Sequence, residues 1–98
     1  MIIAALSIFP IGKGTSLSRF VTASLQALED TGVQFRTGAM STTIEAANLD
    51  QLFAAVKVAH NAQLKMGAKR IYMVLNIDDR KDKEASIESK LHSVGIKA

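Results

Sequence analysis

The chain has 98 residues, of which 48% are hydrophobic and 21% charged, and its formal net charge is +3. This length suits one domain with one hydrophobic core, and the composition excludes a disordered or collagen-like chain. Acidic residues are interleaved with the basic ones, so a nucleic-acid-binding arm is not indicated. The sequence contains no Cys, which excludes disulfides and Cys-based zinc sites. We therefore expect one domain over residues 1–98 and no nucleic-acid partner.

The apolar N-terminal run ends at Pro10. It is shorter than the ~20 apolar residues that cross a membrane, and it lacks the basic start and cleavage site of a signal peptide. We expect a cytoplasmic protein with no membrane partner.

The first half of the chain predicts a strand, a helix and two further strands. Residues 2–9 are apolar at both alternating sets of positions, as in a strand buried on both faces. After Pro10, either Thr15 or Ser16 is expected to cap a helix whose apolar positions run from Leu17 to Leu28 and which ends at Gly32. Residues 33–37 and 41–46 predict two strands that form a hairpin.

The second half predicts a helix, a strand and a short helix. Asn48 and Gln51 resemble a capping box, and the helix that follows ends at Gly67. Residues 70–78 predict the fourth strand, and a third helix is expected to end at Gly95. The apolar face expected for the second helix consists of Leu49, Leu52, Phe53, Val56, Ala59 and Leu64. This order predicts an α+β fold, a ferredoxin-like βαββαβ sandwich with a short C-terminal helix.

The first and fourth strands are apolar on both faces, which predicts self-association. In the ferredoxin-like fold two helices cover one face of the sheet, so a monomer would expose the other face. A contiguous exposed apolar surface usually marks an interaction site. We expect sheet-to-sheet pairing into a homo-oligomer, a dimer or a dimer of dimers. The alternative is that the C-terminal helix folds back over the sheet.

Motifs for catalysis, metal binding or nucleotide binding are incomplete. Residues 12–16 resemble a phosphate-binding loop, but Ser7 and Gly14 stand where that motif needs a Gly and a Ser or Thr. His60 and His92 lie on different predicted helices, and neither has a second metal ligand at suitable spacing. We expect no catalytic residue, no metal site and no cofactor.

Five strand positions carry polar residues where apolar ones would also fit: Ser7, Thr43, Glu45, Asn76 and Asp78. A carboxylate near a partly buried interface could pair with a ligand cation, and an amide or hydroxyl could bind the edge of a heterocycle. Phe9, Phe20 and Tyr72 are available for stacking. The alternative is that these residues simply face solvent at the sheet edge.

Three stretches resemble the small thiamine-binding proteins of the YkoF-like group. They are residues 9–12 (FPIG) followed by Ser16 and Ser18, residues 38–46 (GAMSTTIEA), and residues 77–83 (IDDRKDK) followed by Lys90 and Val94. The resemblance covers almost the whole chain.

The resemblance implies a ferredoxin-like subunit of a homotetramer that binds thiamine or its hydroxymethylpyrimidine moiety near subunit contacts. It points to Glu45, Thr43 and Ser16 as pocket residues, to which the strand pattern adds Ser7 and Asn76. Thiamine carries a fixed thiazolium cation that a carboxylate can pair with, and its aminopyrimidine offers hydrogen-bonding edges.

Other functions are compatible with the same pattern. An oligomeric regulatory module could bind another metabolite or an anion. RNA-recognition domains share the strand order but stack bases on strand aromatics in a motif that this chain lacks. An isomerase-like site assembled across subunits is a further alternative, because a fold does not settle a function.

Overall fold

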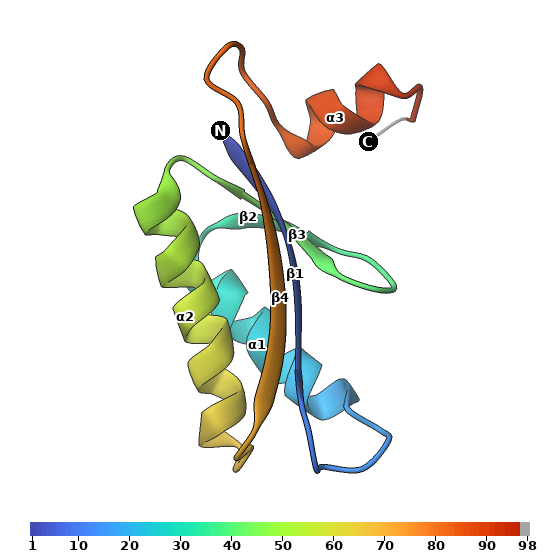
Figure 1. Cartoon of the computed structure of the whole chain (residues 1–98), viewed down its shortest axis with the longest axis vertical. Helices are drawn as coiled ribbons and strands as arrows, with labels where there is room; N and C mark the ends of the chain where they lie inside the picture. Colours follow the sequence, from blue (N-terminus) through green and yellow to red (C-terminus); the bar gives the residue numbers. More distant parts are fainter. Residues whose placement is uncertain (97–98) are drawn as a thin grey trace.

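The computed structural model describes residues 1–96 as a four-stranded antiparallel sheet, with two helices on one face and a short helix on the other (Figure 1). The strand order across the sheet is β2-β3-β1-β4, which is the ferredoxin-like arrangement and confirms the prediction. The elements in chain order are β1 (Ile2–Pro10), α1 (Ser18–Thr31), β2 (Gln34–Thr37), β3 (Thr42–Ala46), α2 (Leu49–Lys65), β4 (Ile71–Asp79) and α3 (Ile87–Ser93).

The central strand β1 separates the two faces of the sheet. Side chains alternate between the faces of a strand. Ile2, Ala4 and Leu6 face α1 and α2, where they form the core together with Ile44 and other buried residues. The opposite face, which we call the open face, carries Ile3 and the other odd-numbered residues of β1. Because β1 pairs with both β3 and β4, its register also decides which of their residues reach the open face.

The start of α1 differs from the prediction. The N-terminal cap is Leu17, whose side chain makes no capping hydrogen bond, so the expected cap at Thr15 or Ser16 is wrong. The backbone carbonyl of Leu17 accepts from the amides of Phe20 and Val21, and Phe20 is 1% exposed. Burial of apolar side chains in this first turn takes the place of a polar cap. The C-terminal end is as predicted, with Gly32 in the left-handed conformation.

The helix α2 starts as predicted but buries a different stripe. The Asn48 side chain accepts from the amide of Gln51 at 2.8 Å. The side chain of Gln51 accepts from the amide of Ala47, one residue before the position expected in a capping box. The buried residues are Leu52, Ala55, Val56, Ala59 and Gln63.

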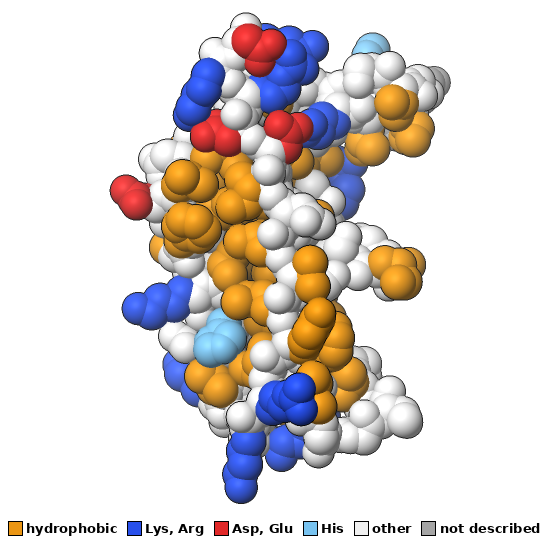
Figure 2. Space-filling model, viewed as in Figure 1, with side chains coloured by type: hydrophobic (Ala, Val, Ile, Leu, Met, Phe, Trp, Pro, Cys, Tyr) orange, Lys and Arg blue, Asp and Glu red, His pale blue; other side chains and the backbone are white. Residues whose placement is uncertain are grey.

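Three residues expected on the buried face of α2 are exposed. Leu49, Phe53 and Leu64 are 42%, 50% and 44% exposed, so their prediction as core residues is wrong. At 3.6 residues per turn they lie on one flank of the stripe centred on Leu52 and Ala59, which places them beside the sheet rather than over it. Figure 2 shows the resulting band of apolar side chains over α2 and β4.

The two large helices are joined by a buried polar contact. The hydroxyl of Ser24 in α1 donates to the backbone carbonyl of Ala59 in α2 at 2.7 Å. The Gln63 amide nitrogen donates to the Ser24 hydroxyl at 3.0 Å and to the carbonyl of Ile8 at 3.3 Å. Within residues 1–96 the buried Gln63 Oε1 has no hydrogen-bond partner. Hydrogen bonds therefore fix the relative position of α1, α2 and β1 where apolar packing alone would allow sliding.

Within residues 1–96, none of the helices combines the length and the apolar content that crossing a membrane requires.

The substitution Ser24→Ala is expected to lower the free energy of unfolding by about 1–2 kcal/mol, because the buried Gln63 amide loses an acceptor. Combined with Gln63→Met, the loss should be smaller than the sum of the two single losses, because the partner group is then removed as well. Urea denaturation measures the free energy of unfolding of the single variants and of the double variant. Thr22→Ala is the matched control, since this exposed hydroxyl also donates to a backbone carbonyl in α1. A Ser24→Ala loss as small as that of the control would contradict the prediction.

Candidate functional site

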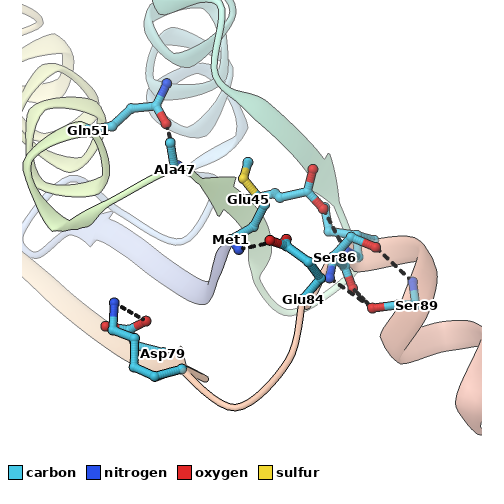
Figure 3. Close-up of polar contacts among 10 residues, drawn as sticks. Met1, Glu45, Ala47, Gln51, Asp79, Glu84, Ser86 and Ser89 are labelled. Carbon is cyan, nitrogen blue, oxygen red and sulfur yellow. Dashed lines mark hydrogen bonds and ion pairs between the residues drawn. The ribbon is translucent and has the colours of Figure 1, made fainter.

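The helix α3 packs on the open face through two carboxylates of the sheet. One row of paired residues across this face consists of Gln34, Glu45, Ile3 and Asp78. Glu45 Oε1 accepts from the backbone amide of Ile87 at 2.8 Å, and the Lys90 ammonium forms an ion pair with Asp78. Figure 3 shows Glu45 reaching from β3 toward the start of α3. These two contacts place α3 across the sheet above Ile3.

The first turn of α3 is closed by local hydrogen bonds. The Ser86 side chain accepts from the Ser89 amide at 2.9 Å, and the Ser89 side chain accepts from the Ser86 amide at 2.8 Å, which is a capping box (Figure 3). No residue of α3 is buried. A seven-residue helix with so little apolar burial depends on its caps and on its contacts with the sheet.

The segment between β4 and α3 contains an exposed ion pair. Arg80 and Asp82 form a two-bonded contact between guanidinium and carboxylate. The hydrogen bond from Arg80 holds the pKa of Asp82 below its usual value, and the same bond raises the pKa of Arg80. This pair shapes the turn and lies outside the groove described next.

The space between α3 and the open face is a groove of about 440 Å³, which we call the α3 groove. It covers the next row of paired residues, Arg36, Thr43, Ala5 and Asn76. Its described lining residues are Ile3, Ala4, Ala5, Arg36, Thr43, Asn76, Ile77, Asp78, Ile87, Lys90 and Leu91. The floor is apolar and the sides offer an amide, a hydroxyl and charged groups, a combination typical of small-ligand sites.

A second hollow, of about 350 Å³, lies between the end of β1, the start of α1 and the loop that joins β2 to β3. We call it the loop pocket. Its described lining residues are apolar or carry hydroxyls, and none of them is charged. The Ser7 hydroxyl donates to the carbonyl of Met40 at 3.0 Å and so ties this loop to β1.

Comparison with known proteins identifies the family. Residues 4–95 match the sequence profile of the family described as thiamine-binding protein. The chain belongs to this family. A UPF0045 protein of Methanothermobacter thermautotrophicus is 43% identical over 95 residues, which cover 96% of this chain and 96% of the relative.

Solved structures of similar proteins have the same fold. A hypothetical protein from Methanocaldococcus jannaschii is 38% identical with a TM-score of 0.88, over 96% of this chain and 95% of that chain. A Thermotoga maritima protein named as a candidate thiamine biosynthesis or salvage protein has a TM-score of 0.81 over 95% of this chain and 97% of its own. That protein is 19% identical, so the likeness concerns the fold alone. Family membership supports a role in small-ligand binding.

The structure divides the five predicted site residues between different places. Thr43 and Asn76 line the α3 groove. Glu45 borders it at the start of α3, where one of its oxygens binds the Ile87 amide. Ser7 lines the loop pocket, and the exposed Ser16 is not part of the described lining of either hollow. Within residues 1–96 there is no cluster of His, Cys, Asp or Glu side chains that could hold a metal ion.

Reasoning from the sequence did not select several residues of the α3 groove. Arg36 is a polar residue at an alternating position of its strand. The alternation shows that it faces the same side as the groove only once the pairing of Arg36 with Thr43 is known. Lys90 and Leu91 reach the groove because α3 turns back over the sheet. The alternative prediction, that the C-terminal helix folds back over the sheet, is therefore correct for the part of the open face that α3 covers. The aromatic pair Phe9 and Tyr72, with ring centroids 5.5 Å apart, lies further along the open face.

The substitution Glu45→Ala is expected to loosen α3, because it removes the acceptor that the Ile87 amide uses and exposes that end of the helix to fraying. The cost should be about 1–2 kcal/mol, as for one hydrogen bond at a partly buried position. Hydrogen exchange should accelerate about 5- to 30-fold at the Lys90 amide, which bonds within α3.

The control is the Leu52 amide in α2, which should exchange at an unchanged rate after the same substitution. Glu45→Gln keeps an acceptor oxygen and should have a smaller effect on α3. Equal protection of Lys90 in the native protein and in Glu45→Ala would show that Glu45 does not hold the helix.

Proposed function

We propose that this protein binds thiamine or its hydroxymethylpyrimidine precursor, without chemical conversion, in the α3 groove. Membership in the thiamine-binding protein family supports the ligand class. The proposed site residues are Thr43, Asn76 and Glu45. Ser7 and Ser16, which share no hollow with these three, are proposed to support the loops at the other end of the sheet instead.

The observation that carries the proposal is the row formed by Thr43, Ala5 and Asn76. The methyl side chain of Ala5 leaves room above the sheet, and the residues on both sides of it carry hydrogen-bonding groups. Neighbouring strands lie about 4.8 Å apart, so Thr43 and Asn76 flank a strip about 10 Å wide, which accommodates a flat ring. The Asn76 amide both donates and accepts, as the edge of an aminopyrimidine requires.

The carboxylates beside the groove suit the cationic part of thiamine. Asp78 lines the groove and Glu45 borders it, each with one contact to α3. A carboxylate oxygen accepts more than one hydrogen bond and attracts a fixed cation. A thiazolium ring seated between the sheet and α3 would lie within reach of these charges.

Binding without chemistry is supported by the hydrogen bonds of two serine side chains that line the loop pocket. Ser7 and Ser24 donate to backbone carbonyls instead of contacting a His or a carboxylate that could act as a base. His60 and His92 lie on different helices, α2 and α3.

Isothermal titration of the native protein with thiamine and with hydroxymethylpyrimidine should show saturable binding of at least one of them. Asn76→Ala should weaken binding by about tenfold, because a buried ligand edge loses its partner. Glu45→Gln should weaken thiamine more than the neutral pyrimidine. Ser16→Ala, outside the groove, is the control and should leave both affinities unchanged. No binding of either ligand at millimolar concentration would overturn the proposal.

We further propose that the protein is a homo-oligomer assembled through its sheet, a dimer of dimers with the ligand site near the subunit contacts. The open face beyond α3 exposes Tyr72 and Val74, which are 51% and 41% exposed. The edge strand β4 and the flank of α2 add Met73, Ile77 and Phe53 to the exposed apolar surface (Figure 2). An apolar face beside a free strand edge is a surface that a second copy can cover.

Sedimentation equilibrium should give a mass of four times the 10.5 kDa of one chain. Val74→Lys should shift the equilibrium toward the monomer if the open face forms the contact, because a buried, unpaired ammonium group is costly. Phe53→Lys tests the α2 flank in the same way. Lys65→Glu, an exposed position on another side of the same helix, serves as a charge control. A monomeric native protein at micromolar concentration would refute the assembly.

A further inference from the structure

The α3 groove contains two cationic side chains, Arg36 and Lys90, which differ in their partners. Lys90 is neutralised by Asp78. Arg36 is exposed on β2, and no carboxylate in residues 1–96 lies within ion-pair distance of its guanidinium. The acidic residues that share a hollow with it are Asp78, which is paired with Lys90, Glu45, whose Oε1 is bound by the Ile87 amide, and the exposed Glu88.

Arg36 lies in the same row of the sheet as the residues proposed to hold the ring. It pairs directly with Thr43, and Ala5 and Asn76 follow in the next two strands. With strands about 4.8 Å apart, the row from Asn76 to Arg36 extends over roughly 14 Å. A ring seated over Ala5 therefore has a hydrogen-bonding amide at one end and a guanidinium beyond Thr43 at the other.

We propose that the preferred ligand of the α3 groove is a phosphate monoester of the heterocycle, with its phosphate bound by Arg36. This inference rests on the proposed function and specifies its substrate class. A guanidinium presents a planar fork of donors that matches phosphate oxygens in two parallel hydrogen bonds. A neutral ligand would leave Arg36 without a partner, and a purely cationic ligand would also place a like charge beside it.

The polar and charged side chains of the groove match each part of such a ligand. A thiamine phosphate has a hydrogen-bonding pyrimidine, a cationic ring and an anionic end. The groove offers the amide of Asn76, the carboxylate of Asp78 and the guanidinium of Arg36. A phosphorylated hydroxymethylpyrimidine uses the first and the last of these. Both ligands present the same phosphate chemistry to Arg36, and separate titrations distinguish them.

The experiment compares matched pairs of ligands by isothermal titration. The native protein is titrated with thiamine and thiamine monophosphate, with hydroxymethylpyrimidine and its phosphate ester, and with inorganic phosphate alone. We expect the phosphorylated member of at least one pair to bind about 10- to 100-fold more tightly, the contribution of a charge-assisted bidentate contact. Inorganic phosphate should bind weakly, because it makes no contact with the groove floor.

Variants of Arg36 identify the residue responsible. Arg36→Gln should abolish the preference for the phosphorylated member of each pair. Arg36→Lys should retain part of this preference, because it keeps the charge but not the fork. Arg70→Gln is the matched control. This exposed arginine directly precedes β4 and lies outside the described groove lining, so the variant should keep the full preference.

The outcomes separate this inference from the proposed function. Equal binding of phosphorylated and unphosphorylated ligands would overturn the inference and leave the proposed function standing. A preference that survives in Arg36→Gln would also overturn it, because the phosphate would then be bound elsewhere. Absence of binding by every ligand would overturn both. Far-UV circular dichroism shows whether each variant is folded. If Arg36→Gln does not fold, Arg36→Lys provides a second test.

Discussion

The pairing of β1 with β3 on one side and β4 on the other is the constraint on which the rest of the structure depends. Because β1 is central, its register determines which residues of three strands face the helices and which face the opposite side. Ile2, Ala4 and Leu6 face the helices and are almost completely buried. A shift by one residue would exchange this core for the polar rows of the open face, so the core and the groove depend on the same register.

The open face shows how a short, weakly apolar helix is held on a sheet. Glu45 and Asp78 lie on either side of Ile3, and each binds a group of α3. A helix without a buried residue gains little from apolar packing, so directional hydrogen bonds and an ion pair determine where it lies. The groove is the space left between these contacts, since the helix rests on one row of the sheet and overhangs the next. Most of its polar lining therefore comes from strands, whereas its upper wall, with Lys90, comes from the helix.

The apolar surface at the edge of the molecule has a different origin. The stripe of α2 that packs on the sheet is narrow and contains small residues, Ala55 and Ala59, which bring the helix close to β1 and β3. Phe53 and Leu64 are displaced to the flank by the same geometry. They meet the exposed side of β4, the last strand of the sheet, which has no neighbour on that side within the described chain. The close approach of α2 to the sheet thus concentrates exposed apolar groups along one edge.

The sequence by itself determined the order and type of the elements, because their periodicity and end signals are local. The apolar run of β1, the Asn48 cap of α2 and the glycine after α1 each act within a few residues. The sequence also indicated Thr43, Glu45 and Asn76 as unusual polar strand residues. Only the tertiary structure decided which of them share a groove, because Arg36, Thr43 and Asn76 come together through strand pairing across the chain. The same holds for the flank position of Phe53 and for the cap of α1, where burial of Phe20 outweighed the local preference for a hydroxyl cap.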